Sequence, residues 1–265
     1  VEITRNIPLI LQLLFWYALL INLPRVKNSI AIGETFFLNN RGFLSPQPIY
    51  GDNFIFVTAA IIIAIVGSIF FSRWAKRKQE ETGKQYPLFL INAASIILFP
   101  IIIYFISGSP LDFERPVLKG FNFVGGMQMP PEFVAMFLGL SIYTASFISE
   151  IVRAGILSVG KGQIEAAKSI GLKQNVIMNL IIIPQALRVI VPPLTSQFLN
   201  LTKNSSLGIA IGYADLVHGF GGISLNQTGQ AIECMAIVMA TYLTISLSIS
   251  FFMNIYNRAI QLEGR

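Results

Sequence analysis

The chain has 265 residues, of which 54% are hydrophobic and 12% are charged, with a formal net charge of +6. Soluble domains carry about 25% charged residues, so this composition excludes an ordinary water-soluble globule and indicates a membrane protein. The single cysteine, Cys234, excludes an internal disulfide framework and a cysteine-rich metal site.

Three apolar stretches in the first part of the chain predict membrane spans at about 5–23, 54–72 and 88–106. Between the first two, residues 24–53 are polar and rich in turn-forming residues, so we expect an extramembranous insertion there. Pro100 predicts a kink within the third span.

Three further spans are predicted at about 132–156, 188–211 and 230–255. A second insertion with many Gly and Pro residues, 107–131, precedes them, and a polar loop, 157–187, separates the fourth span from the fifth. The sequence therefore predicts an all-α fold, a polytopic transmembrane helical bundle that forms a single domain over residues 1–265.

Positively charged residues gather in three segments, 73–84, 153–188 and 257–265, which six alternating spans place on one side of the membrane. The loops on the opposite side carry fewer positive residues, and these are balanced by Asp52, Asp112, Glu114 and Asp215. Because cytoplasmic loops carry the excess of Lys and Arg, the loop 157–187 is predicted to be cytoplasmic.

That loop contains the sequence EAAKSIGLKQNVIMNLIIIP, residues 165–184. A short run of good helix formers leads to Gly171, whose freedom in φ suits a sharp turn, and Pro184 fits the first turn of the next helix. The two alanines after Glu165 predict a narrow helical knob that fits closely into a groove of another protein. The alternative is an ordinary amphipathic helix at the membrane surface.

The sequence lacks the common catalytic motifs, with no Gly-x-Ser-x-Gly and no His-Glu-x-x-His. It also lacks the G-x-x-x-x-G-K-[ST] phosphate-binding loop, so it does not bind ATP by that device, and any ATP hydrolysis belongs to a partner. His218, the one histidine, has no accompanying Cys or carboxylate cluster in the sequence, so we expect neither an enzyme nor a metal site.

The second informative stretch is a polar cluster in the fifth span. Lys203 lies roughly 22 Å along a helix that starts at Arg188, inside a hydrocarbon layer of about 30 Å. Polar groups at that depth are costly unless they face a wet cavity or a partner, and these offer donors for a carboxylate and acceptors for an ammonium. We predict that the cluster lines a translocation path, with interhelical hydrogen bonding as the alternative for each residue. Its members are Asn200, Thr202, Lys203, Asn204, Ser205 and Ser206.

Four polar residues stand apart from this cluster. Gln12 in the first span is a candidate for the path or for a helix-to-helix hydrogen bond. Glu233, near the outer start of the sixth span, is either a carboxylate facing the path or an interfacial residue. Glu150 and Arg153, spaced i,i+3 near the cytoplasmic end of the fourth span, are expected to pair as a structural anchor rather than as a gate.

The segment 165–184 resembles the EAA loop of ABC-importer permeases, whose pattern is E-A-A, three residues, G, nine residues and I-x-L-P; only Ile183 departs from it. Five stretches resemble permeases of polar amino-acid ABC importers, the histidine and glutamine permeases: 5–9, 150–156, 162–167, 184–188 and 203–207. The insertion of roughly 24–131, with two extra spans, is similar to the larger general L-amino-acid permeases of bacteria.

The resemblance implies a type I permease with a MetI-like fold in the bacterial inner membrane. In that family two permease subunits pair, here expected as a heterodimer, two cytoplasmic ATPases dock below them, and a periplasmic binding protein delivers the substrate. The chain would bind no cofactor, since ATP and Mg are bound by the ATPase. A first core span is expected before Arg5, in a part that precedes Val1. The residues implied to couple to the ATPase are Glu165, Ala166, Ala167, Ser169, Gly171 and Leu172.

Two other functions are open to a membrane protein of this composition. An ion-coupled secondary amino-acid carrier needs an acidic residue at mid-membrane, and the interiors of the predicted spans offer no convincing one. A non-transporting membrane scaffold would not need the polar cluster at depth.

Overall fold

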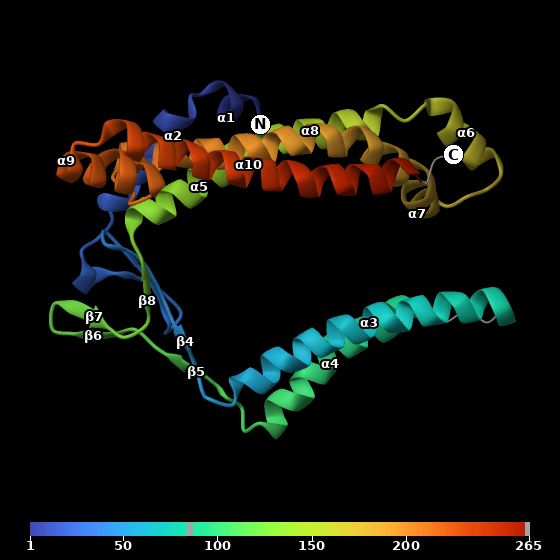
Figure 1. The fold of residues 1–265 in the computed structure, drawn as a ribbon, viewed down its shortest axis with the longest axis horizontal. Coiled ribbons are helices and arrows are strands. Elements are labelled where there is room, and N and C mark those ends of the chain that lie inside the picture. The colour runs from blue at the N-terminus through green and yellow to red at the C-terminus, as the bar shows by residue number, and fades with distance from the viewer. Residues whose placement is uncertain (84–86, 263–265) are drawn as a thin grey trace. The chain divides into compact units, whose positions relative to one another are not determined.

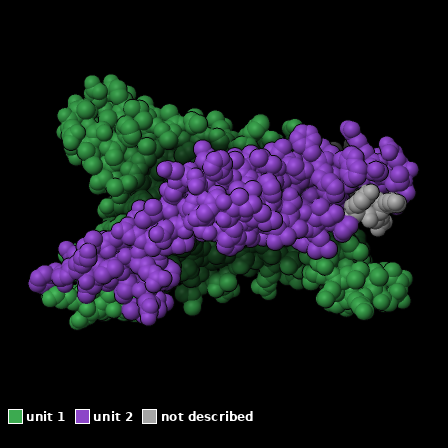
Figure 2. Space-filling model, turned by 90° about the horizontal axis from the view of Figure 1, so that it is seen from below, with its two compact units in different colours: residues 1–30, 38–43, 129–265 green, residues 31–37, 44–128 purple. Residues whose placement is uncertain are grey.

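The computed structural model describes residues 1–83 and 87–262, and the chain divides into two compact units, shown in green and purple in Figure 2. Unit 1 consists of residues 1–30, 38–43 and 129–265, and unit 2 consists of residues 31–37 and 44–128. Unit 1 contains most of the helices and the segments to which the sequence analysis assigns function.

Figure 1 labels the helices of unit 1, of which α5, α8 and α10 are the long ones. The α-helices are α1 (Glu2–Asn6), α2 (Leu9–Ile21), α5 (Pro131–Leu157), α6 (Lys161–Ser169), α7 (Gln174–Ile177), α8 (Ile183–Asn204), α9 (Leu225–Thr228) and α10 (Ala231–Leu262). Shorter helical turns are the 3₁₀ segments η1 (Val26–Asn28) and η3 (Ser205–Ile211), and the π-helical segments η2 (Met178–Ile182) and η4 (Val217–Ser224).

Unit 1 has two small cores instead of one large one. The first joins α2, α5 and η3 and consists of Leu9, Leu13, Leu20, Ala135, Leu140 and Ile211. The second joins the end of α5 to α6, α7, η2 and α8 and consists of Val159, Ala167, Ile177, Ile182, Ala186 and Ile190. The helix bundle is therefore packed separately at its two ends.

Unit 2 contains two long helices, α3 (Phe54–Thr82) and α4 (Leu88–Ile106), which lie side by side in Figure 1. Pro100 lies inside α4, as the sequence analysis expected, and is buried. Gly83 ends α3 in the left-handed conformation, with φ of +71°.

The insertions, which were expected to be loops, contain short β-strands. A four-stranded sheet has the order β1 (Ile30–Ile32), β2 (Phe36–Asn39), β3 (Gly42–Ser45) and β8 (Met127–Met129). In unit 2, β4 (Gln47–Tyr50) pairs antiparallel with β5 (Leu111–Glu114), and β6 (Val117–Lys119) pairs with β7 (Asn122–Val124). In the β4–β5 pair Gln47 faces Glu114 and Tyr50 faces Leu111. The described chain is otherwise mostly helical, as predicted.

Five helical segments of the described chain are long and apolar enough to cross a membrane: 54–82, 88–106, 131–157, 174–211 and 231–258. They include five of the six predicted spans. The segment predicted to span at about 5–23 is not one of these five. Ile7 is extended and Pro8 precedes a new helix, so α2 has only 13 residues. At 1.5 Å per residue that helix is about 20 Å long, shorter than the hydrocarbon layer of about 30 Å.

Candidate functional site

The elbow between α5 and α8 consists of α6, a turn at Gly171, and the α7–η2 segment. Gly171 has a φ of +79°, the left-handed conformation that glycine adopts without steric cost. Its N–H donates to the carbonyl of Lys168 at 2.9 Å, and the N–H of Leu172 donates to the carbonyl of Ala167 at 3.2 Å. These two bonds are a Schellman motif, which satisfies carbonyls at the end of α6 and fixes the direction in which the chain leaves it.

Helix α6 has one buried and one exposed face. Ala167 is buried and Ile164 half-buried in the second core, and Leu172 after the turn packs on the same cluster. Glu165 and Ala166 are exposed. The predicted knob therefore presents one alanine, Ala166, beside the carboxylate, because the other alanine is used to hold the helix to its own subunit.

Ser169 has a local role within this helix. Its hydroxyl donates to the carbonyl of Glu165 at 3.0 Å, while the residue itself is exposed. A hydroxyl bonded back to the preceding turn is occupied by its own helix.

The elbow contacts α8, the helix that carries most of the polar cluster. The Nε2 of Gln185 in α8 donates to the Oε1 of Gln163 in α6 at 2.5 Å. The second core joins the same two helices through Ala167, Ile182 and Ala186. Packed apolar contacts and a hydrogen bond thus both connect α6 to α8.

Between the turn and α8 the helix is locally widened. Residues Met178–Ile182 form a π-helical segment, and Pro184 follows in the first turn of α8, where its missing N–H is tolerated. The helical segment thus begins at Gln174, earlier than the predicted start of the fifth span at about 188.

The elbow lies at the same end of unit 1 as the C-terminal end of α10 (Figure 1). Exposed basic side chains gather at this end: Arg153, Lys161, Lys168, Lys173, Arg188 and Arg258. In unit 2, Arg73, Arg77 and Lys78 lie toward the end of α3. Lys84 and Arg265, which also belong to the predicted basic segments, lie outside the described residues, as does the side chain of Lys76.

Two members of the polar cluster line a cavity. Asn200 and Asn204, one turn apart on α8, open onto a space of about 280 Å³ between α5 and α8. Its other lining residues are Tyr143, Thr144, Phe147, Gln197 and Leu201. The wall therefore combines amide and hydroxyl groups with two aromatic rings, and Thr144 is buried at 7% exposure. This is a polar cavity in an apolar bundle.

The three hydroxyls of the cluster are engaged with their own helix. Thr202 donates to the carbonyl of Phe198 at 3.0 Å, Ser205 to that of Thr202 at 2.7 Å, and Ser206 to that of Lys203 at 2.7 Å. None of these residues lines the cavity, and Lys203 is exposed. The geometry therefore separates the two asparagines from the rest of the predicted cluster.

Gln12 and Glu233 are placed away from the cavity. The Nε2 of Gln12 donates to the carbonyls of Thr4 at 2.6 Å and Ile7 at 3.0 Å, across the break between α1 and α2. Glu233 is exposed in the first turn of α10, where a carboxylate interacts favourably with the helix dipole.

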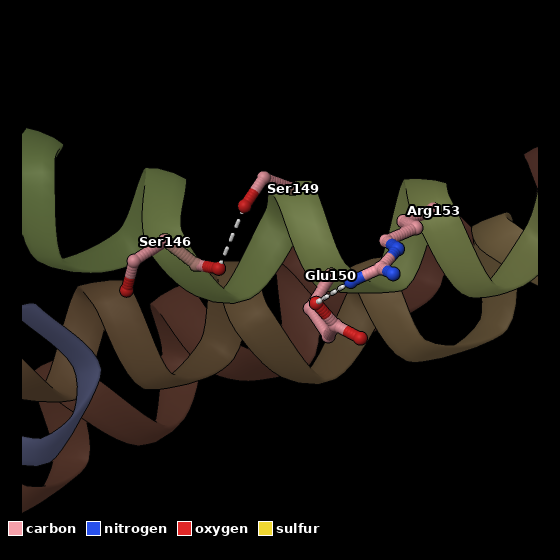
Figure 3. A network of polar contacts seen from close by, with 4 residues as sticks. All are labelled: Ser146, Ser149, Glu150 and Arg153. Atoms are coloured by element: carbon pink, nitrogen blue, oxygen red, sulfur yellow. Dashed lines mark hydrogen bonds and ion pairs between the residues drawn. The ribbon is translucent and has the colours of Figure 1, made fainter. Parts of the chain in front are cut away.

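The expected pair of Glu150 and Arg153 is present. Figure 3 shows the Oε2 of Glu150 and the Nη1 of Arg153, which are 3.9 Å apart. The Arg153 side chain is 71% exposed, so the pair contributes little to stability. The hydroxyl of Ser149, the residue before Glu150, donates to the carbonyl of Ser146 at 2.9 Å, so the whole group is local to α5.

Five cavity residues were not among the predicted site residues, and one of them is the apolar Leu201. Gln197 belongs to the same stripe as Asn200 and Asn204, spaced i, i+3 and i+7, so the helical period was a usable signal for it. Tyr143, Thr144 and Phe147 come from α5 and carry no local signal, because only packing brings α5 against α8. Over the described residues no group of three or more His, Cys, Asp or Glu side chains could hold a metal ion.

Comparison with known proteins gives matches over the whole chain. Residues 86–262 match the family described as "Binding-protein-dependent transport system inner membrane component". The chain is 51% identical to YhdX of Escherichia coli, which is named as an amino-acid ABC transporter permease, and 48% identical to the general L-amino acid transport system permease protein AapQ of Rhizobium johnstonii. It is 41% identical to BztB of Rhodobacter capsulatus, a glutamate/glutamine/aspartate/asparagine transport system permease. Each match covers 100% of this chain and 68%, 66% and 69% of the relative, respectively.

Proposed function

Because the chain belongs to the family of inner-membrane components of binding-protein-dependent transport systems, and is thus a permease subunit of an ABC transporter, we propose that it imports polar L-amino acids. The observation that carries the proposal is similarity along the whole chain to permeases named for amino acids, one of them for glutamate, glutamine, aspartate and asparagine. The chain spans about two thirds of the length of these relatives.

We propose that α6 is the element through which ATP hydrolysis drives transport. Its exposed Glu165 and Ala166 would dock on a cytoplasmic ATPase, which binds ATP and Mg, and Gly171 and Leu172 would fix the angle of the docked helix. The contacts from Ala167 and Gln163 to α8 support this role, since they connect the docking face to the helix that lines the cavity. Closure of the ATPases would then reorient α8 and alternate the access of the cavity.

We further propose that the cavity between α5 and α8 is part of the substrate path. A zwitterionic amino acid needs donors for its carboxylate and acceptors for its ammonium group. The amides of Gln197, Asn200 and Asn204 supply both, and the hydroxyls of Tyr143 and Thr144 add to them. Thr202, Lys203, Ser205 and Ser206 would shape the end of α8 beside it.

The assembly proposed is that of an importer in a bacterial inner membrane. It has a second, different permease subunit, two cytoplasmic ATPase subunits and a periplasmic binding protein that delivers the amino acid. The family description, which names both a binding protein and the inner membrane, supports this arrangement, as do the bacterial relatives. Within it, residues 1–265 act as one permease domain, with 157–187 as the cytoplasmic coupling loop.

The test is uptake by the full-length permease reconstituted with its partner subunits in liposomes. We expect ATP-dependent uptake of radiolabelled glutamine or glutamate, with Asn200→Ala and Asn204→Ala each raising KM about tenfold, as loss of a hydrogen bond to a charged group would do. Thr202→Val is the matched control on the same helix and should leave KM within twofold. Uptake driven by an ion gradient without ATP would contradict the proposal and favour a secondary carrier.

A further inference from the structure

Unit 2 has a pocket of its own, whose lining is partly polar and partly apolar. It has a volume of about 340 Å³ and lies between α3 and α4. Its lining residues are Ile65, Ser68, Ile69, Ser72, Arg73, Asn92 and Ile96. Nothing proposed above for amino-acid transport uses it.

The pocket contains polar atoms that lack partners. Ser68 is 7% exposed, and among the described residues neither its Oγ nor the Oδ1 of Asn92 has a hydrogen-bond partner. A polar atom left unpaired in a buried place destabilises the fold. Two such atoms at one pocket leave hydrogen-bonding capacity for a water or a bound group.

The arrangement of hydrogen bonds leaves donors for an anion. The Nδ2 of Asn92 donates to the Oγ of Ser72 at 2.7 Å, so the hydroxyl proton of Ser72 is left to donate elsewhere. Arg73 is exposed at the same pocket, and no carboxylate of the described chain pairs with it. Arg73, Ser68 and Ser72 together offer a guanidinium and two hydroxyls to one ligand.

The position of the pocket along α3 and α4 fits the depth of the lipid headgroups. Arg73 is about 28 Å along α3 from its start at Phe54, close to the thickness of the hydrocarbon layer, and Asn92 is about 6 Å into α4. Beside the pocket, the Nζ of Lys78 lies 4.8 Å from the ring centre of Trp74, and tryptophan is enriched at this depth. Below these groups Ile65, Ile69 and Ile96 form an apolar wall.

We propose that this pocket binds the phosphodiester of an anionic phospholipid headgroup in the cytoplasmic leaflet. Arg73 and the two serine hydroxyls would hold the phosphate oxygens, a hydroxyl of the headgroup would donate to the Oδ1 of Asn92, and the acyl chains would lie along the isoleucine wall. Basic pockets between helices on the cytoplasmic side are suited to such headgroups. The assignment rests on the proposed membrane orientation and not on the identity of the transported amino acid.

The experiment is native mass spectrometry of the complete transporter in detergent, titrated with phosphatidylglycerol, with phosphatidylcholine or with inorganic phosphate. We expect phosphatidylglycerol alone to be retained, with Arg73→Gln weakening its binding tenfold or more and Ser68→Ala several-fold. Arg77→Gln is the matched control, because it removes the same charge one turn further along α3, outside the pocket, and should change binding less than twofold. Circular dichroism melting establishes that each variant is folded.

Three results would overturn the proposal. Equal weakening by the Arg73 and Arg77 variants would mean a diffuse attraction to the basic surface. Equal binding of inorganic phosphate would mean a site for a free anion. Unchanged lipid binding together with loss of a partner subunit in the Arg73 variant would mean that a protein helix fills the pocket. The mass spectrometry measures bound lipid and does not depend on uptake. Failure of the lipid-binding proposal can therefore be distinguished from failure of the proposed import function.

Discussion

At the scale of single residues, Gly171 is the position on which the shape of the elbow depends most. A Cβ built there meets no atom within 4 Å, so the requirement is for the backbone conformation with φ of +79°, not for space. That conformation disfavours other residues by about 1–2 kcal/mol, and β-branched residues most. We expect Gly171→Val to lower the transport achieved per ATP hydrolysed while ATPase activity persists, measured as uptake and phosphate release by the reconstituted complex.

The control for this prediction is Gly171→Asn at the same position. Asparagine adopts the left-handed conformation more readily than other non-glycine residues, so the Schellman motif and the coupling should largely survive. Wild-type coupling in the valine variant would show that the geometry of this turn does not matter for transport.

The residues of the candidate site differ in how far the sequence predicted them. The turn at Gly171 was predictable, because it rests on a local backbone preference. The inward face of α6 was not, since a nine-residue helix with two adjacent alanines gives no sign of which one, Ala166 or Ala167, packs inside. Likewise, Asn204 and Ser205 are adjacent polar residues that the sequence does not distinguish. Only the structure shows that Asn204 lines the cavity, while the hydroxyl of Ser205 donates to the carbonyl of Thr202.

At the scale of elements, hydropathy predicted the long helices well, because each is apolar over most of its length. Hydropathy also predicted a span at about 5–23, but in the structure the helix is interrupted at Ile7 and Pro8. The residue before a proline disfavours the helical conformation, and here this local preference outweighs the apolar run. The β-strands of the insertions were missed because they have three or four residues each and turn-forming residues surround them. Their pairing is nonlocal, as between β4 and β5.

The crossing of α5 and α8 depends on the absence of a side chain at Gly155. A Cβ there would overlap the Cγ1 of Ile190 and lie 3.2 Å from the carbonyl oxygen of Ala186. We expect Gly155→Ala to destabilise the subunit by about 1–3 kcal/mol, the usual range for overpacking, seen as a lower melting temperature of the purified complex.

Gly162→Ala is the matched control for this change. A Cβ at Gly162 meets nothing within 4 Å, and alanine favours helix more than glycine does in the first turn of α6, so the melting temperature should hold or rise slightly. Equal melting temperatures for the Gly155 variant and the wild type would contradict a close crossing at this point.

At the scale of the whole molecule, the chain buries little of its apolar surface within itself. In α10 only 6% of the most apolar window is buried, and the corresponding share for α5 is 28%. Exposed apolar helices of this kind are stable only against lipid or against other apolar helices. The described units are therefore those of a membrane subunit whose outer faces are completed by the bilayer and by partner subunits.

The central claim is that α6 contacts the ATPase, and site-specific cross-linking tests it most directly. The buried Cys234 is first replaced by alanine. One variant then carries Ala166→Cys on α6, and the control carries Gln227→Cys on α9, at the opposite end of unit 1. Each has one accessible thiol in the described chain. With the assembled transporter and a short thiol-to-amine linker, we predict a covalent product between the Ala166→Cys permease and the ATPase subunit, and none for Gln227→Cys. Absence of that product, or its formation only from the α9 position, would contradict the account.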